Sequence, residues 1–308
     1  MLDFIDINKN ELKLYNAASK EAMLYAKNAS DTDPFIITAR EKAREKLKDA
    51  ILPNGKIAWS KLPNLITSNT KLKKDVLGLS NDIEIFGLSL APHYVSGYNT
   101  CNGLSIGCTN VCLMFTGHGQ KFMVDCNGNH NVAIARIIRT FLWFEYREQF
   151  KARLLHELKL KYNLLKSKNI DLAFRPNVFS EQKFELLFKE LFYFCNEYNI
   201  PMYDYVKDIK RIVNNPFKDF YHMTYSLSEN NSLFIPTALK HGCNIAVVID
   251  TPVKAPKPKQ LTINGITLGV INGDKHDARF IDSKNKFIAL SGKGLDAKND
   301  TTNFIRKV

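Results

Sequence analysis

From residue 83 onward, short β-branched and aromatic runs alternate with longer amphipathic stretches, and this alternation restricts the fold more than any other feature. The longest amphipathic stretch, NVAIARIIRTFLWFEYREQFKARLLHELKLKYNLLK, predicts one long helix or a helix pair. The strand-like runs are IEIFGLSLAP, IDLAFRPN, PMYDYVKD, FYHMTYSLSE, CNIAVVID, TLGVIN and KFIALSGKG. Strands that alternate with helices form βα units around a mainly parallel sheet. We therefore expect an α/β fold over residues 83–308, built as a partial, TIM-like βα barrel.

The first 80 residues have a different pattern. DTDPFIITAREKAREKLKDAIL offers Asp33 and Pro34 as a helix start, then apolar residues at helical spacing, and LPNG as a stop. This region carries no chemical motif. We expect residues 1–80 to be a helical extension that serves packing or a partner.

Composition restricts the compartment and the partners. The start, MLDFIDINKNELKLYN, has acidic residues and no apolar core of a secretory signal, and no stretch is apolar enough to span a membrane. We therefore expect a cytoplasmic protein with no membrane partner, in which close cysteines bind metal or do chemistry rather than form disulfides. The net charge of +12 is compatible with nucleic acid, although a lysine-rich coding style gives the same excess.

Polar residues follow the predicted strands in a consistent way. The carboxyl ends of parallel strands carry the site in such folds, so these residues should share one face. We assign three of them as candidate catalytic residues: Arg175, Asp204 and Lys207. Asn177 and Ser226, with Arg136 and Arg139 on the helix after the first strand, are candidates for binding a cofactor. Arginines bind phosphate or carboxylate, and a surface position is the alternative for Arg136 and Arg139.

Three of the six cysteines lie in one loop after the first strand: Cys101, Cys108 and Cys112. Six residues separate the first two and three residues separate the last two, whereas zinc modules usually supply two close pairs. Three thiolates from one loop can hold three irons of a [4Fe–4S] cluster and leave the fourth open to a ligand or substrate. This favours iron–sulfur over zinc, which would need Cys126, His118 or His130 as a fourth ligand. The layout is similar to that of radical S-adenosylmethionine (SAM) enzymes, although their usual spacing is C-x3-C-x2-C, and SAM is a candidate second ligand.

Other reactive residues have plainer interpretations. Cys195 and Cys243 lie in apolar runs and should be core thiols. His93, beside the cysteine loop, is a candidate ligand or proton carrier, with a solvated loop position as the alternative. His222 alternates with apolar residues along a strand and should point inward.

Residues 271–282, INGDKHDARFID, concentrate carboxylates at Asp274, Asp277 and Asp282. Such a cluster can bind Mg²⁺ for nuclease chemistry. The spacing favours a turn between two strands, in which the aspartates cap backbone amides and pair with Arg279.

Seven sequence blocks follow one another over residues 83–308: GLSLAPHYVSGYNTCNGLSIGCTNVCLMFTGHG, ARIIRT, YDYVK, YHMTYSLSE, CNIAVVI, INGDKHDARFID and GKGLDAKNDTTNFIRK. These blocks and their order resemble the gene product 88 family of phage proteins. The resemblance implies a protein that works in a bacterial host, and no reaction. The residues that match its cysteine, polar and acidic positions are Cys101, Cys108, Cys112, Arg136, Arg139, Arg175, Tyr203, Asp204, Lys207, His222, Asp274, Asp277 and Arg279. Where similar proteins read RLNGTSD, this chain reads RPNVFSE, which puts ligand contacts from that loop in doubt.

The leading hypothesis is a phage-encoded iron–sulfur enzyme, with a radical-SAM-like barrel and a three-cysteine loop at the strand ends, that acts on an anionic or nucleotide-like small molecule. Two rival hypotheses are a nucleic-acid-binding protein with a structural metal, for replication or host takeover, and a Mg²⁺-dependent nuclease.

Overall fold

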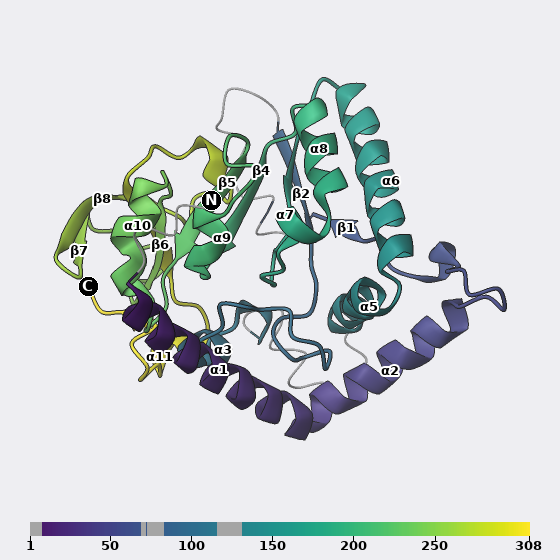
Figure 1. Ribbon diagram of the computed structural model, residues 1–308, viewed down its shortest axis with the longest axis horizontal. Helices are drawn as coiled ribbons and strands as arrows, with labels where there is room; N and C mark the ends of the chain where they lie inside the picture. The colour runs from purple at the N-terminus through teal and green to yellow at the C-terminus, as the bar shows by residue number, and fades with distance from the viewer. Residues whose placement is uncertain (1–7, 69–71, 73–82, 116–130) are drawn as a thin grey trace.

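The computed structural model describes residues 8–68, 72, 83–115 and 131–308, and its centre is one ten-stranded sheet (Figure 1). Along the sheet the order is β1-β2-β3-β4-β5-β6-β9-β8-β7, and β10 pairs with β6 off this path. All pairs from β2 to β8 along the path are parallel, and the two end pairs are antiparallel. The strands are β1 (Ile66–Thr67), β2 (Ile83–Leu88), β3 (Asp171–Arg175), β4 (Met202–Val206), β5 (Tyr221–Ser226), β6 (Ile245–Ile249), β7 (Gln260–Ile263), β8 (Ile266–Asn272), β9 (Lys286–Ser291) and β10 (Ile305–Arg306).

The α/β class is therefore confirmed, whereas the sheet is open and the predicted partial, TIM-like barrel is not confirmed. Its edges are β1 and β7. The β7–β8 hairpin turns at Asn264 and Gly265, whose φ angles of 48° and 73° suit a tight hairpin turn of the Asn-Gly type. Sequence reasoning missed β7 although Asn-Gly between two strand-like runs is a strong hairpin signal.

The helices follow the predicted pattern closely. The long amphipathic stretch is a helix pair, and α2 begins at Pro34 with the Asp33 carboxylate accepting from the backbone N–H of Phe35 at 2.8 Å. No helix in the described part of the chain is long and apolar enough to cross a membrane. The α-helices are α1 (Lys9–Thr32), α2 (Pro34–Ala50), α3 (Ile106–Asn110), α5 (Asn131–Glu145), α6 (Arg147–Lys166), α7 (Phe184–Leu187), α8 (Lys189–Glu197), α9 (Ile209–Val213), α10 (Ile235–Lys240) and α11 (Leu295–Lys298).

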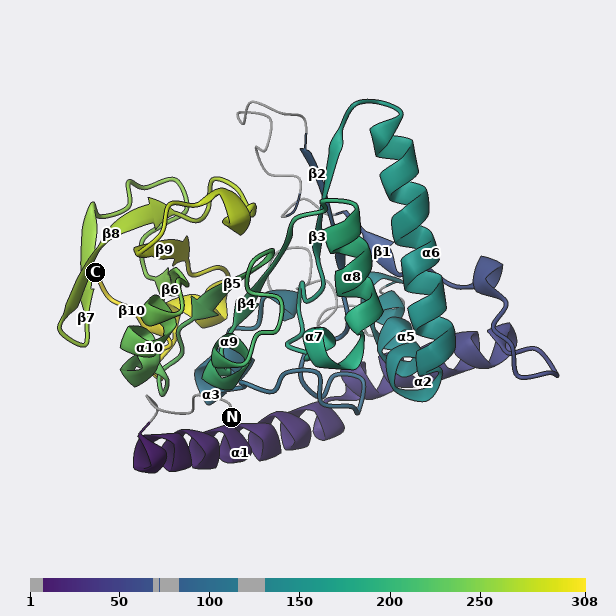
Figure 2. The same ribbon diagram turned by 45° about the horizontal axis from the view of Figure 1, so that its top comes forward.

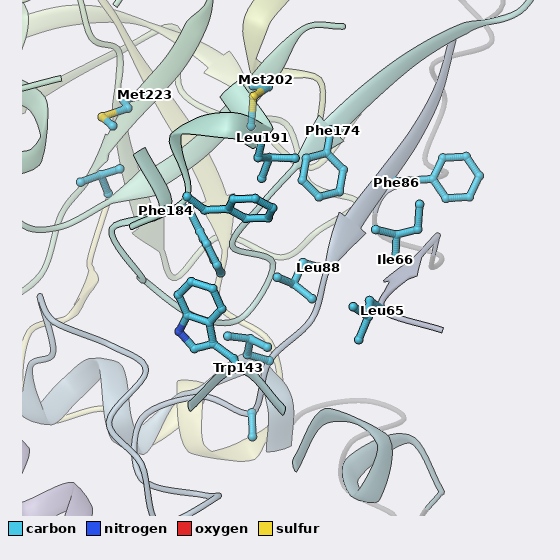
Figure 3. Close-up of a cluster of buried hydrophobic side chains, with 14 of the residues drawn as sticks. Leu65, Ile66, Phe86, Leu88, Trp143, Phe174, Phe184, Leu191, Met202 and Met223 are labelled. Atoms are coloured by element: carbon cyan, nitrogen blue, oxygen red, sulfur yellow. The ribbon is translucent and has the colours of Figure 1, made fainter. Parts of the chain in front are cut away.

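The main core lies between one face of the sheet and helices α5 to α8. Trp143, Phe174 and Phe184 are fully buried there, with the rings of Trp143 and Phe184 4.7 Å apart (Figure 3). Each such aromatic side chain contributes about 2–3 kcal/mol by burial. Because side chains alternate along a strand, Leu172 and Met202 face this core, and the residues next to them face the other side of the sheet.

The N-terminal helices α1 and α2 meet at a corner and run along one side of the molecule (Figures 1 and 2). Ala22 and Ala26 of α1 are fully buried and pack against Leu104 in the cysteine loop. Alanine at these positions allows a close approach of the helix to the loop. α1 therefore covers the loop that carries the cysteines.

Strand β6 changes its partner along its length on one side of the sheet. The first two residues of β6 pair with the end of β5, whereas Val248 and Ile249 pair with β10. The C-terminal tail thus occupies the edge of β6 that extends past β5. Residues of β5, β6 and β10 at this offset line the cavity described below.

Candidate functional site

A cavity of about 1200 Å³, counted with its open mouth, lies at the carboxyl ends of the parallel strands. It brings together most of the residues that sequence analysis assigned to a site, namely Cys101, Cys108, Cys112, Arg175, Asn177, Lys207 and Ser226. Asp274, Ser291 and Lys293 line it from β8 and β9, and Val248, Phe304 and Ile305 supply apolar surface from β6 and the C-terminal tail. The structure therefore places the three thiols and the polar strand ends in one space.

The cysteine loop is shaped by local hydrogen bonds. Cys101 forms an isolated parallel bridge with Glu181, and α3 follows with Ser105 as its N-cap. The Ser105 hydroxyl accepts from the backbone N–H of Cys108 at 3.2 Å. Cys108 lies in α3 and Cys112 follows the end of that helix, and both line the cavity.

A carboxylate that sequence analysis missed fixes the loop to β4. Glu181 accepts from the backbone N–H groups of Gly103 at 3.1 Å, Lys207 at 2.8 Å and Asp208 at 2.9 Å. A side chain on Gly103 would collide with Glu181 and Lys207, so only glycine allows this approach. Glu181 thereby fixes Cys101 and Lys207 relative to each other.

A second missed carboxylate, Glu229, fixes α3 to the loop after β5. It accepts from the Ser105 hydroxyl and from the backbone N–H of Gly107, both at 2.7 Å. Gly107 also packs against the C-terminal tail, where an added Cβ would lie 2.5 Å from Cβ of Phe304. Both carboxylates follow strand ends, and that position was the signal that could have identified them.

The thiols have few charged partners. Burial, with a smaller contribution from the neighbouring thiols, raises the pKa of Cys101 and Cys112 to about 12. Burial also raises the pKa of Cys108, against Lys207, which lowers it. Lys207 hydrogen bonds to Cys108; burial lowers the Lys207 pKa, but Cys108 and Glu181 outweigh burial and the net shift is upward. The thiols stay protonated unless a further cation stabilises the thiolates.

Arg175 lines the cavity but its hydrogen bonds go to the protein. Its guanidinium donates to the Asp277 carboxylate at 2.8 Å and to the backbone carbonyls of Asn177 at 3.2 Å and Val178 at 3.4 Å. The Tyr203 hydroxyl donates to the same Asp277 oxygen at 2.9 Å. Arg175 therefore stabilises the wall of the cavity through these hydrogen bonds.

Asp204, predicted to be catalytic, is fully buried and is not among the residues that line the cavity. Its carboxylate accepts from the Asn177 amide at 2.6 Å and from the Tyr221 hydroxyl at 2.8 Å. Burial raises its pKa to about 7, although Arg211 and Arg175 oppose the rise. Asp204 therefore supports Asn177 from behind the wall.

The two helix arginines also lie behind the wall. Arg136 stacks on the cavity residue Phe179, with its guanidinium carbon 4.0 Å from the ring centroid. Arg139 is buried and donates to the carbonyl of Asn64 at 2.7 Å. Burial lowers the pKa of each to about 10. Arg136 lies near Cys112, whereas Arg139 faces away from the cysteine loop toward the chain before β1.

The aspartates of residues 274–282, which we call the acidic block, do not converge. Asp274 pairs with Lys257 at 3.2 Å and accepts from the backbone N–H of Ser291 at 3.0 Å. Asp277 pairs with Arg175, and Asp282 pairs with Arg279 at 3.2 Å. This is close to the predicted turn and offers no shared Mg²⁺ position.

In the described ranges, no three His, Cys, Asp or Glu side chains are arranged to hold a metal ion. Cys126, His118 and His130, the candidate fourth ligands, lie outside the residues that the structure describes. Cys195 and Cys243 are buried as predicted, and His222 is half-buried with its ring 6.3 Å from that of Phe280.

His93 lines the cavity and is 3% exposed. Its backbone N–H donates to Sγ of Cys101 at 3.2 Å, and its Nδ1 lies 3.5 Å from the Ser30 hydroxyl. Burial lowers its pKa to about 4, assisted by Arg40, so the ring is neutral at physiological pH.

The sequence profile of the gene product 88 family matches residues 63–307, which is most of the chain. The chain belongs to the gene product 88 family of phage proteins. The match begins 20 residues before the resemblance noted above, so it includes β1 and excludes α1 and α2. Searches of curated proteins and of solved structures found no match.

Proposed function

We propose that this gene product 88 protein is an iron–sulfur enzyme of the host cytoplasm, in which Cys101, Cys108 and Cys112 hold a [4Fe–4S] cluster inside the cavity. The observation that carries the proposal is the convergence of three thiols from one loop on a cavity at the carboxyl ends of parallel strands. That arrangement of loop and strands is similar in layout to radical SAM enzymes. The open sheet, with seven consecutive parallel strands, is compatible with a partial barrel.

The residues fit such a cluster in number, chemistry and surroundings. Thiolates are the usual ligands of iron–sulfur clusters, and three of them from one loop leave one iron for another ligand. Without a metal, burial and mutual repulsion keep these thiols protonated. A bound cation reverses that balance, because it stabilises each thiolate directly.

The spacing of the thiols along the chain favours a cluster over a single zinc ion, because zinc modules usually supply two close pairs of cysteines. The ligands of a cluster surround a larger volume and need not converge on one point. Three thiols on the wall of one cavity are compatible with that requirement.

The cavity also carries groups that suit a small-molecule ligand. Lys207, Ser226 and Lys293 add polar contacts, and Val248 and Phe304 add an apolar surface. Lysines beside an apolar wall suit an anionic or nucleotide-like ligand, and SAM belongs to that class. A bound cluster supplies one-electron chemistry, while these side chains bind and orient the substrate.

The test is anaerobic purification followed by spectroscopy. We expect a brown protein that absorbs at about 400 nm and holds about four irons and four sulfides per chain. Cys108→Ala should lose most of the iron, whereas Cys195→Ala, a change at a buried thiol in α8, should keep it. A colourless protein with one zinc per chain would contradict the proposal.

The rival hypotheses gain no support from the site. The aspartates of the acidic block bind to different cations, so a Mg²⁺-dependent nuclease has no candidate centre there. A nucleic-acid partner still depends on the net charge of +12 alone. We therefore propose no second function.

A further inference from the structure

One wall of the cavity is apolar and is built by three separate parts of the chain. Val111 follows α3, Val248 belongs to β6, and Phe304 precedes β10 in the C-terminal tail. Val111 and Phe304 share one small core cluster, and Val248 and the Cys108 side chain pack against that cluster. This apolar wall, formed by Val111, Val248 and Phe304, therefore borders one of the three thiols.

The charged side chains of the cavity are mostly matched by their neighbours. Those that the described residues place there are three cations and two carboxylates: Arg175, Lys207, Lys293, Glu181 and Asp274. Arg175 forms an ion pair with Asp277 at 2.8 Å. Lys207 is hydrogen bonded to Cys108 and lies near Glu181. The charges of these two cations are thus taken up within the protein.

Lys293 supplies a positive charge that the cavity does not match. Its Nζ lies 3.6 Å from the Asp274 carboxylate, which is longer than a hydrogen bond. Asp274 is already neutralised by Lys257, whose Nζ lies 3.2 Å away and whose side chain is 3% exposed. Lys257 also donates to the carbonyls of Thr251 and Pro252 and is fixed there. The Lys293 side chain is 38% exposed, so its ammonium can pair with a ligand.

We propose that the cavity binds an amphipathic acid, a molecule with an apolar body and a single negative group such as a carboxylate. The apolar body lies against Val248 and Phe304, and the acid group pairs with Lys293. The inference rests on the proposed function, because it places the substrate in the same cavity, and it narrows the anionic or nucleotide-like class. A nucleoside triphosphate carries several negative charges, and an unmatched charge in a partly buried site is costly.

The same contacts give the ligand an orientation. Cys108 packs on the apolar wall beside Val248 of β6. Lys293 follows β9, and its partner Asp274 follows β8. The apolar body is therefore placed beside the Cys108 thiol, and the acid group points toward β8 and β9. In the proposed enzyme, the part of the substrate nearest the cluster is thus apolar.

The experiment is isothermal titration calorimetry of the purified full chain with naphthoate and with naphthamide, its neutral amide. The two probes share an apolar body and differ in the negative charge. We expect the native chain to bind naphthoate about three- to fivefold more tightly, which is the contribution of a partly exposed ion pair. Lys293→Met should remove this preference. Lys298→Met, the same change at an exposed position of α11, should leave it unchanged.

Val248→Ala tests the apolar wall and should weaken both probes by the same factor, about fivefold. Equal binding of the two probes to the native chain, binding of neither, or a preference that survives in Lys293→Met would overturn the inference. An iron-containing chain without the preference contradicts this inference alone. A chain without iron that shows the preference contradicts the proposed function and keeps the ligand class. The comparison of the two probes on the native chain does not depend on whether any variant folds.

Discussion

The cysteine loop and the acidic block lie at the same end of the sheet, but they differ in how their reactive side chains are satisfied. In the acidic block each aspartate has a cation close by: Lys257 for Asp274, Arg175 for Asp277 and Arg279 for Asp282. The three thiols share one bonded cation, Lys207, with Arg136 beyond it. In the acidic block the protein itself supplies a cationic partner for each aspartate. In the cysteine loop it does not, so an added cation would stabilise the thiolates there. This difference predicts that substitutions in the first change stability and substitutions in the second change metal content.

Arg175→Met should have the largest effect on stability. It leaves Asp277 in the interior without its guanidinium partner, and breaking a buried pair in this way costs about 3–5 kcal/mol. Urea denaturation of the metal-free chain measures the loss. The double variant Arg175→Met/Asp277→Asn should recover part of it, and additive losses would show that the pair does not act as a unit.

The free energy of unfolding should also depend on pH, because Asp204 is buried in a hydrogen-bond network with Asn177 and Tyr221. Burial raises the pKa of Asp204 from 3.8 to about 7, so the folded chain holds a proton there that the unfolded chain releases. This bound proton adds at most about 4 kcal/mol to the free energy of unfolding. The added stability is fully present below pH 3.8 and is lost as the pH rises through about 7. Asp204→Asn should flatten the stability curve in this range. An unchanged slope in the variant would contradict the assignment.

Glu181→Ala tests the attachment of the cysteine loop to the end of β4. It leaves the backbone N–H groups of Gly103, Lys207 and Asp208 without their carboxylate, which should cost about 2–3 kcal/mol. Because the cysteine loop then loses its attachment to β4, iron retention should fall as well. Glu181→Gln keeps one acceptor oxygen and should lose less of both. Full iron retention in Glu181→Ala would argue against this role.

Gly107→Ala should cost about 1–3 kcal/mol, because the new methyl group would overlap the side chain of Phe304 in the C-terminal tail. Gly269→Ala is the matched control, since there the new methyl group meets only the flexible end of Lys286. Thermal unfolding compares the two. Equal losses would mean that the tail does not pack tightly on the cysteine loop.

Cys112→Ser should have the smallest effect on stability, within about 1 kcal/mol for the metal-free chain, because the thiol is half-buried on an open cavity. Its iron content should nevertheless fall sharply. A stability loss as large as that of Arg175→Met would place this thiol among the structural residues and weaken the contrast between the two regions.

Much of the fold was predictable because local signals were strong. The start of α2 at Pro34, the helix pair and seven strands followed from capping residues and periodicity. The short strands β1 and β10 have two residues each and carry no periodicity, so they could not be predicted. The predicted partial barrel is not confirmed for a related reason, since the arrangement of the sheet edges depends on contacts that no local pattern encodes.

The site was predictable only in part. Alternation along β4 places Asp204 with Met202 on the core side of the sheet and Lys207 with Tyr205 on the cavity side, and this rule would have removed Asp204 from the candidates. The roles of Glu181 and Glu229 were harder to predict, because their partners include backbone N–H groups that any residue carries. Arg139 likewise bonds to a backbone carbonyl far along the chain.

X-ray absorption at the iron edge, on anaerobically purified protein, tests the central claim most directly. If the three thiols hold a cluster, the spectrum shows sulfur neighbours and a second shell of iron neighbours, and Cys108→Ala loses both. A sample whose iron has only oxygen and nitrogen neighbours, or one that holds zinc in place of iron, would contradict the account.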